Sequence, residues 1–162
     1  MRIAFDLDGM LIPAPGSPMA VEQLGPLARL ISREQIRAGA PGLLTALRRR
    51  GHETWLYTTS YRSPMRLRAW FAAFGVRLDG IVNQVHHQAI VPRAVSSKYP
   101  PAFGIDLLID DSEGVVLEGR RHGFAVLHVV AHDMAWCSRV DLAVRAMEDE
   151  RARCVGDGIA LA

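Results

Sequence analysis

The segment IAFDLDG, residues 3–9, runs from a short apolar stretch directly into two aspartates and a glycine. Alternate side chains of an extended strand share a face, so Asp6 and Asp8 are expected to point the same way, with Cα atoms about 6–7 Å apart. Like charges at this spacing are costly unless a cation lies between them, and Mg²⁺ prefers carboxylate oxygens. Taken alone, the pair fits a metal site and a strand-end turn with a capping aspartate equally well.

Short apolar runs alternate with amphipathic stretches along the chain. The sequence predicts buried strands over 2–7, 54–58, 105–109 and 124–130, and helices over 41–50, 64–74, 113–122 and 137–148. Because strands that alternate with helices indicate βαβ units, we expect an α/β, three-layer, Rossmann-like fold with a central parallel sheet flanked by helices. Ligands of such sheets bind beyond the carboxyl ends of the strands, which is where Asp6 and Asp8 fall.

The chain of 162 residues is long enough for one domain with one core. We expect a single core domain over residues 1–150, with irregular insertions at about 10–40 and 83–101, and a C-terminal tail over 151–162. The first insertion begins with a turn-rich segment, and its moderately apolar part, 21–36, predicts a short helix.

Composition narrows the class of protein. The formal net charge is +2 and the basic residues are scattered arginines, which favours solvated helix faces over a nucleic-acid surface. The apolar runs are far shorter than the roughly 18 residues that span a bilayer, so we expect no membrane contact. The two cysteines have no metal-ligand spacing, and the first strand leaves no room for a signal peptide, so we expect a reducing, cytoplasmic location.

Three more signals follow at predicted strand ends or in loops. Thr58 and Thr59 follow an apolar strand and offer hydroxyl and N–H groups to phosphate oxygens, although such residues also cap helices. Lys98 is the only lysine, and can neutralise a phosphoryl group or nearby carboxylates. Asp110 and Asp111 end a second buried strand. A metal shared with the first aspartate pair relieves the repulsion within both pairs.

In this order, FDLDG at 5–9, WLYTTS at 55–60, Lys98 and LLIDDSEG at 107–114 resemble the motifs of the haloacid dehalogenase superfamily of phosphohydrolases and phosphotransferases. The resemblance covers roughly residues 2–130. It implies Mg²⁺ as the cofactor and a capless or minimally capped member of the family, because the intervals between the motifs leave little room for a cap domain.

The resemblance also implies a role for each motif residue. It implies a nucleophile (Asp6), a general acid/base (Asp8), a phosphate-binding hydroxyl (Thr58, with Thr59 as the competing register), a motif cation (Lys98) and a metal-binding acidic pair (Asp110 and Asp111). Mg²⁺ is expected to contact Asp6, the backbone carbonyl of Asp8, and Asp110 or Asp111.

The expected activity is Mg²⁺-dependent hydrolysis of a phosphomonoester through an aspartyl-phosphate intermediate. Asp8, protonated by its crowded neighbourhood, is expected to donate a proton to the leaving-group oxygen and then to deprotonate the attacking water. Its presence favours phosphoryl transfer over dehalogenation. The alternatives are a catalytically silent phosphate-binding or interaction module on the same fold, and a phosphotransferase.

An uncapped site implies a bulky phosphorylated substrate or a lid supplied by a neighbouring subunit of a homo-oligomer. The candidate substrates are phosphorylated nucleic-acid ends, phosphoproteins and small phosphate esters. Nucleic acid is expected only as a substrate. Arg62 is the candidate substrate contact, gripping a second phosphate or a carboxylate; the alternative is a solvated arginine at a helix start. His86 and His87 are expected in an irregular loop, either at the entrance of the site or merely exposed.

Overall fold

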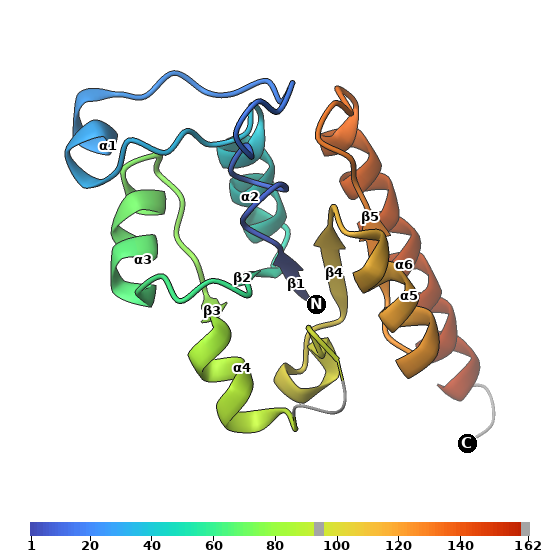
Figure 1. Ribbon diagram of the computed structural model, residues 1–162. Helices are drawn as coiled ribbons and strands as arrows, with labels where there is room; N and C mark the ends of the chain where they lie inside the picture. The colour runs from blue at the N-terminus through green and yellow to red at the C-terminus, as the bar shows by residue number, and fades with distance from the viewer. Residues whose placement is uncertain (93–95, 160–162) are drawn as a thin grey trace.

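The computed structural model describes residues 1–92 and 96–159, and a five-stranded, all-parallel sheet lies at its centre (Figure 1). The strands stand in the order β3-β2-β1-β4-β5. Their bounds are Arg2–Phe5 (β1), Glu53–Tyr57 (β2), Gly80–Val82 (β3), Leu107–Asp110 (β4) and Val126–His128 (β5). The predicted α/β, Rossmann-like fold is confirmed.

Helices flank both sides of the sheet. They are α1 (Pro26–Ile31), α2 (Ala40–Arg49), α3 (Pro64–Ala72), α4 (Gln84–Ile90), α5 (Glu113–His122) and α6 (Trp136–Ile159), with one 3₁₀-helix, η1, at Pro100–Phe103. Within the described ranges, none of these helices combines the length and the apolar character that crossing a membrane requires.

Three local expectations are corrected. The region 83–101, expected to be irregular, contains α4, and η1 begins at its end. Strand β3 was not predicted because three residues are too few to show a periodicity. Helix α6 was expected to end at residue 148 but continues to Ile159. Arg151 on this extension pairs with Asp106 at 2.5 Å, and this contact ties the extended helix to the segment before β4.

The two faces of the sheet pack on different helices. Ile3, Phe5 and Ile109 belong to a core cluster that includes side chains of α2, α3 and α6. Ala4 and Leu108, which alternate with them along the strands, belong to a second cluster that includes side chains of η1 and α5. The sheet is therefore the middle of three layers, and its carboxyl edge is left to the loops.

Arg37 ties the insertion at 10–40 to the connection between β5 and α6. Its side chain is buried, and its Nη2 donates to the carbonyl oxygens of Val130, Ala131 and Asp133 at 2.9, 3.2 and 3.0 Å. Its guanidinium also lies over the ring of Trp136, 4.8 Å from the centroid. These contacts hold the insertion beside the carboxyl edge of the sheet.

Candidate active site

Two carboxylates and one ammonium group meet at the carboxyl ends of β1 and β4. Asp6 directly follows β1, Asp110 ends β4, and the backbone N–H of Asp6 donates to the carbonyl oxygen of Ile109 at 2.9 Å. Lys98 Nζ donates to Oδ1 of Asp6 and, at 2.6 Å, to Oδ2 of Asp110. The exposed fractions of Asp6, Lys98 and Asp110 are 6%, 3% and 1%, so the pairing takes place out of contact with bulk water.

Asp111 adds a third carboxylate to this group. Oxygen atoms of Asp6, Asp110 and Asp111 all lie within 4.8 Å of one another. The Asp111 carboxylate lies against Gly9, where a Cβ atom would stand 2.3 Å from its Oδ2. Gly9 also has a φ of 85°, a conformation that other residues rarely adopt. The glycine of the first motif is therefore required both by its backbone and by the space that Asp111 occupies.

Burial and the neighbouring charges determine the protonation of this cluster. Burial raises the pKa of Asp6 to about 6, against the opposing effect of Lys98 and with a further upward contribution from Asp110. Although burial disfavours the charged form of Lys98, the carboxylates of Asp6 and Asp110 raise the pKa of its amine. Burial and the charge of Asp110 also raise the pKa of Asp111. With a pKa of about 6, Asp6 is mostly ionised at neutral pH, and its ionisation in this buried place lowers the stability of the folded state.

The charge and the donor atoms of the cluster fit a divalent cation. One ammonium group faces three carboxylates, so ionised carboxylates leave an excess of negative charge in a largely buried place. Carboxylate oxygens are the ligands that Mg²⁺ prefers. Asp6, Asp110 and Asp111 are therefore the residues that could hold the ion, while the expected contact through the Asp8 backbone carbonyl stays a prediction.

The Asp8 side chain lies apart from the three clustered carboxylates. Its Oδ2 accepts a hydrogen bond from Arg62 Nη1 at 2.7 Å, and the other end of the guanidinium, Nη2, pairs with Glu34 Oε1 at 2.6 Å. The charged group that contacts Asp8 is thus a guanidinium and not another carboxylate. Glu34 was not singled out in the sequence, since nothing in the local pattern shows which carboxylate Arg62 reaches.

The two threonines after β2 have different surroundings. Thr58 is buried, and its Oγ1 lies 3.5 Å from Asp8 Oδ2 and 3.2 Å from Ser60 Oγ. Thr59 is exposed and borders a shallow surface hollow that includes Tyr61 and His87. The Thr58 hydroxyl is thus the one that lies beside Asp8, and the phosphate-binding role of either threonine stays a prediction.

Two further groups position the cluster and were missed in the sequence. The backbone N–H of Ser112 donates to Oδ1 of Asp110 at 2.9 Å, and Ser112 caps α5. The hydroxyl of Tyr57 accepts from the backbone N–H of Tyr99 at 2.8 Å and contacts His87 Nδ1 at 2.6 Å. The bond from the Tyr99 N–H holds the residue next to Lys98. His87 is buried on α4, so the expectation that it is exposed or at an entrance loop is wrong.

Comparisons with known proteins bear on the fold. No family model and no curated protein matches the sequence. A chain of the Pnkp1/Rnl/Hen1 complex matches with a TM-score of 0.52 and 14% identity over 79% of this chain and 45% of that chain. A chain of the Pnkp1/Rnl/Hen1 RNA repair complex matches with a TM-score of 0.49 and 16% identity, over 82% of this chain and 43% of that chain. A third match is the D,D-heptose 1.7-bisphosphate phosphatase from B. bronchiseptica, in a structure complexed with magnesium and phosphate. Its TM-score is 0.46 and its identity 14%, over 77% of this chain and 78% of that chain.

At 14–16% identity, these matches show a similarity of fold only. The chain spans less than half of each matched chain of the RNA repair complex. The match at a TM-score of 0.52 agrees with the α/β arrangement described above. At 14% identity it assigns no activity to this chain, so the roles of the site residues rest on their geometry.

We expect Gly9→Ala to destabilise the protein and weaken metal binding. Alanine at a φ of 85° costs about 1–3 kcal/mol, and its Cβ displaces the Asp111 carboxylate. Gly16→Ala is the matched control, because Gly16 also has a positive φ but nothing lies within 4 Å of its added Cβ. Thermal unfolding with and without Mg²⁺ checks this: equal Mg²⁺-induced shifts in Tm for the two variants would contradict it.

Without metal, Asp6→Asn is expected to stabilise the chain. The raised pKa of Asp6 means that its ionisation penalises the folded state; the penalty is absent below about pH 4, grows as the pH rises toward 6, and reaches about 1–3 kcal/mol. Urea unfolding in EDTA should therefore show a more stable variant at pH 7.5 and nearly equal stabilities at pH 4. A variant less stable than the native chain at pH 7.5 would count against this account.

Tyr57→Phe is expected to loosen the segment that carries Lys98. The substitution leaves the partly buried N–H of Tyr99 without its acceptor, which costs about 1 kcal/mol. Urea unfolding and hydrogen exchange at the Tyr99 amide measure the effect. Tyr61→Phe, whose side chain is 68% exposed, is the control and should change neither quantity.

Proposed function

We propose that the chain is a Mg²⁺-dependent phosphohydrolase of the haloacid dehalogenase type, which cleaves a phosphomonoester through an aspartyl-phosphate on Asp6. The observation that carries this proposal is the buried group in which Lys98 bridges Asp6 and Asp110, with Asp111 close by. A purely structural ion pair needs no third carboxylate. The excess of negative charge at a strand edge open to loops favours a site that binds a cation and an anionic substrate.

The first half of the proposed reaction transfers the phosphoryl group. A carboxylate oxygen of Asp6 attacks the phosphorus atom, an oxygen–phosphorus bond forms, and the ester bond to the leaving oxygen breaks. Asp8 acts here in its protonated form, for which it takes up a proton from solvent, and gives that proton to the leaving oxygen, so the product leaves as an alcohol. Lys98 holds Asp6 in place, and the hydroxyl of Thr58 beside Asp8 is available to the phosphoryl oxygens.

The second half of the proposed reaction restores the enzyme. Asp8, now a carboxylate, takes a proton from water as the water oxygen attacks the phosphorus atom, and the bond to Asp6 breaks to give inorganic phosphate. Arg62 and Thr58 both contact Oδ2 of Asp8 and orient this carboxyl group. Mg²⁺ held by Asp6, Asp110 and Asp111 would offset the repulsion between the anionic nucleophile and the anionic substrate.

Hydrolysis of p-nitrophenyl phosphate tests this function. We expect turnover with Mg²⁺, no turnover in EDTA, and a loss of at least about a thousandfold in kcat for Asp6→Asn. Asp149→Asn on the exposed side of α6 is the control and should retain native turnover. Native rates in the Asp6→Asn variant would exclude Asp6 as the nucleophile.

Beryllofluoride with Mg²⁺ separates an enzyme in which Asp6 is reactive from a catalytically silent module in which it is not. Binding to the native chain but not to Asp6→Asn is expected, since the analogue occupies the place of the phosphoryl group on Asp6. The balance between free phosphate and a phosphorylated acceptor distinguishes hydrolysis from phosphoryl transfer to another molecule. Absence of both beryllofluoride binding and turnover would reject the proposed enzyme.

A further inference from the structure

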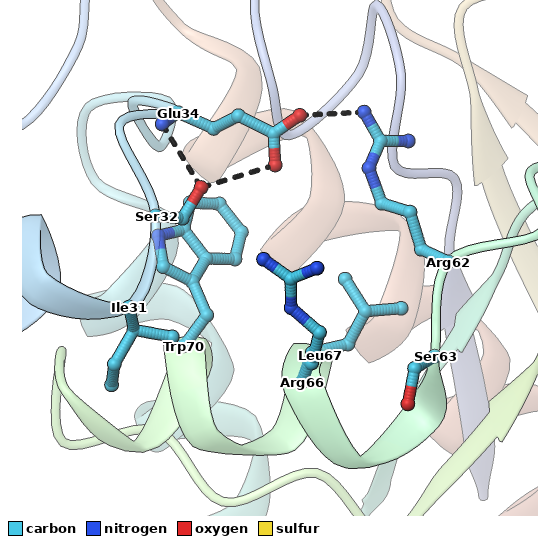
Figure 2. A pocket seen from close by; sticks show the side chains of 8 residues that line it. All are labelled: Ile31, Ser32, Glu34, Arg62, Ser63, Arg66, Leu67 and Trp70. Carbon is cyan, nitrogen blue, oxygen red and sulfur yellow. Dashed lines mark hydrogen bonds and ion pairs between the residues drawn. The ribbon is translucent and has the colours of Figure 1, made fainter.

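A cavity of about 260 Å³ lies between α3 and the segment that follows α1 (Figure 2). The walls are partly apolar and partly charged, and their main side chains are Ser32, Glu34, Arg62, Arg66, Leu67 and Trp70. Leu67 and Trp70 are buried and form an apolar wall. The guanidinium of Arg66 extends from α3 between the indole of Trp70 and the side chain of Arg62 (Figure 2).

Two residues that line the cavity, the buried Trp70 and the exposed Arg66, carry donors with no acceptor among the described residues. In the part of the chain that the structure describes, Arg66 makes no hydrogen bond or ion pair, and the buried indole Nε1 of Trp70 has no partner. By contrast, the indoles of Trp55 and Trp136 each donate at 3.0 Å, to Glu53 and to the Ala38 carbonyl. Buried donors are nearly always satisfied in folded proteins. The buried indole N–H of Trp70 is therefore left for an acceptor from outside the chain, whereas the exposed guanidinium of Arg66 is solvated and free to pair with an anion.

Arg62 connects this cavity to the candidate active site. It lines the cavity, and its Nη1 contacts Asp8 at 2.7 Å. Arg62 is already paired with two carboxylates, Asp8 and Glu34, so Arg66 is the guanidinium group at this wall that remains free to bind an anion. A molecule with one phosphate at Asp6 and a body extending past Asp8 would reach this wall next.

We propose that the cavity binds the part of the substrate remote from the transferred phosphate, and that this part carries a second anionic group, a carboxylate or a phosphate, paired with Arg66. The inference rests on the proposed function and narrows its substrate class. A cavity of about 260 Å³ suits the remote part of a small metabolite. The bulky substrates expected for an uncapped site are not needed to fill it.

Matched esters test the second anion. The pairs are 3-phosphoglycerate with glycerol 3-phosphate, which differ at a carboxylate, and fructose 1,6-bisphosphate with fructose 1-phosphate, which differ at a phosphate. In at least one pair we expect about a tenfold or higher kcat/KM for the doubly anionic ester, the effect of a hydrogen bond to a charged group. Arg66→Gln should bring the ratio close to one. Arg49→Gln, an exposed arginine on α2, should leave the ratio unchanged.

A binding measurement decides the inference without turnover. In Asp6→Asn with Mg²⁺, calorimetry should show the preferred doubly anionic ester binding about tenfold more tightly than its partner, and Arg66→Gln should remove the difference. Nitrogen-15 spectra should show a shift of the indole signal of Trp70, assigned by Trp70→Phe, with smaller shifts for Trp55 and Trp136.

The outcomes separate the two proposals. Turnover of p-nitrophenyl phosphate with no preference in either pair would overturn the inference and leave the phosphatase intact. Preferential binding without any turnover would support the anion site and reject the phosphatase. Equal affinities within both pairs in the calorimetric measurement would overturn the inference whatever the activity.

Discussion

The bridge that Lys98 makes between Asp6 and Asp110 is the interaction on which the site depends. It joins the ends of two neighbouring parallel strands and fixes the orientation of both carboxylates. Because all three groups are buried, losing the ammonium group would leave charges that neither water nor another side chain compensates. The same bridge does not neutralise Asp111, so the cluster retains a demand for positive charge that a divalent cation would meet.

Much of this site follows from the sequence because strand ends can be located from short-range patterns. The apolar runs before Asp6 and Asp110 identify two buried strands, and parallel strands bring their carboxyl ends to one edge. The acidic cluster is a direct result of that topology. Lys98 is different: its approach depends on the contact between Tyr57 and Tyr99, two residues far apart in the chain.

The contacts of Asp8 show where sequence reasoning stops. Strand alternation suggested that Asp8 would face the same way as Asp6, but the chain turns at Gly9 and the Asp8 carboxylate meets Arg62 instead. The length of an arginine side chain allows many partners, and only the packing of the 10–40 insertion brings Glu34 to its other end. For the same reason, the cavity beside α3 has no sequence signature.

The contact between Gly9 and Asp111 joins the turn after β1 to the start of the segment that leads into α5. These two positions come from opposite ends of the family resemblance, yet they share one small volume. A side chain at position 9 can be accommodated only if the residue at 111 becomes smaller or turns away, which would remove a carboxylate from the cluster. A side chain at position 9 would therefore both strain the backbone and remove a carboxylate from the cluster, whereas residue 111 could become smaller without any change at position 9.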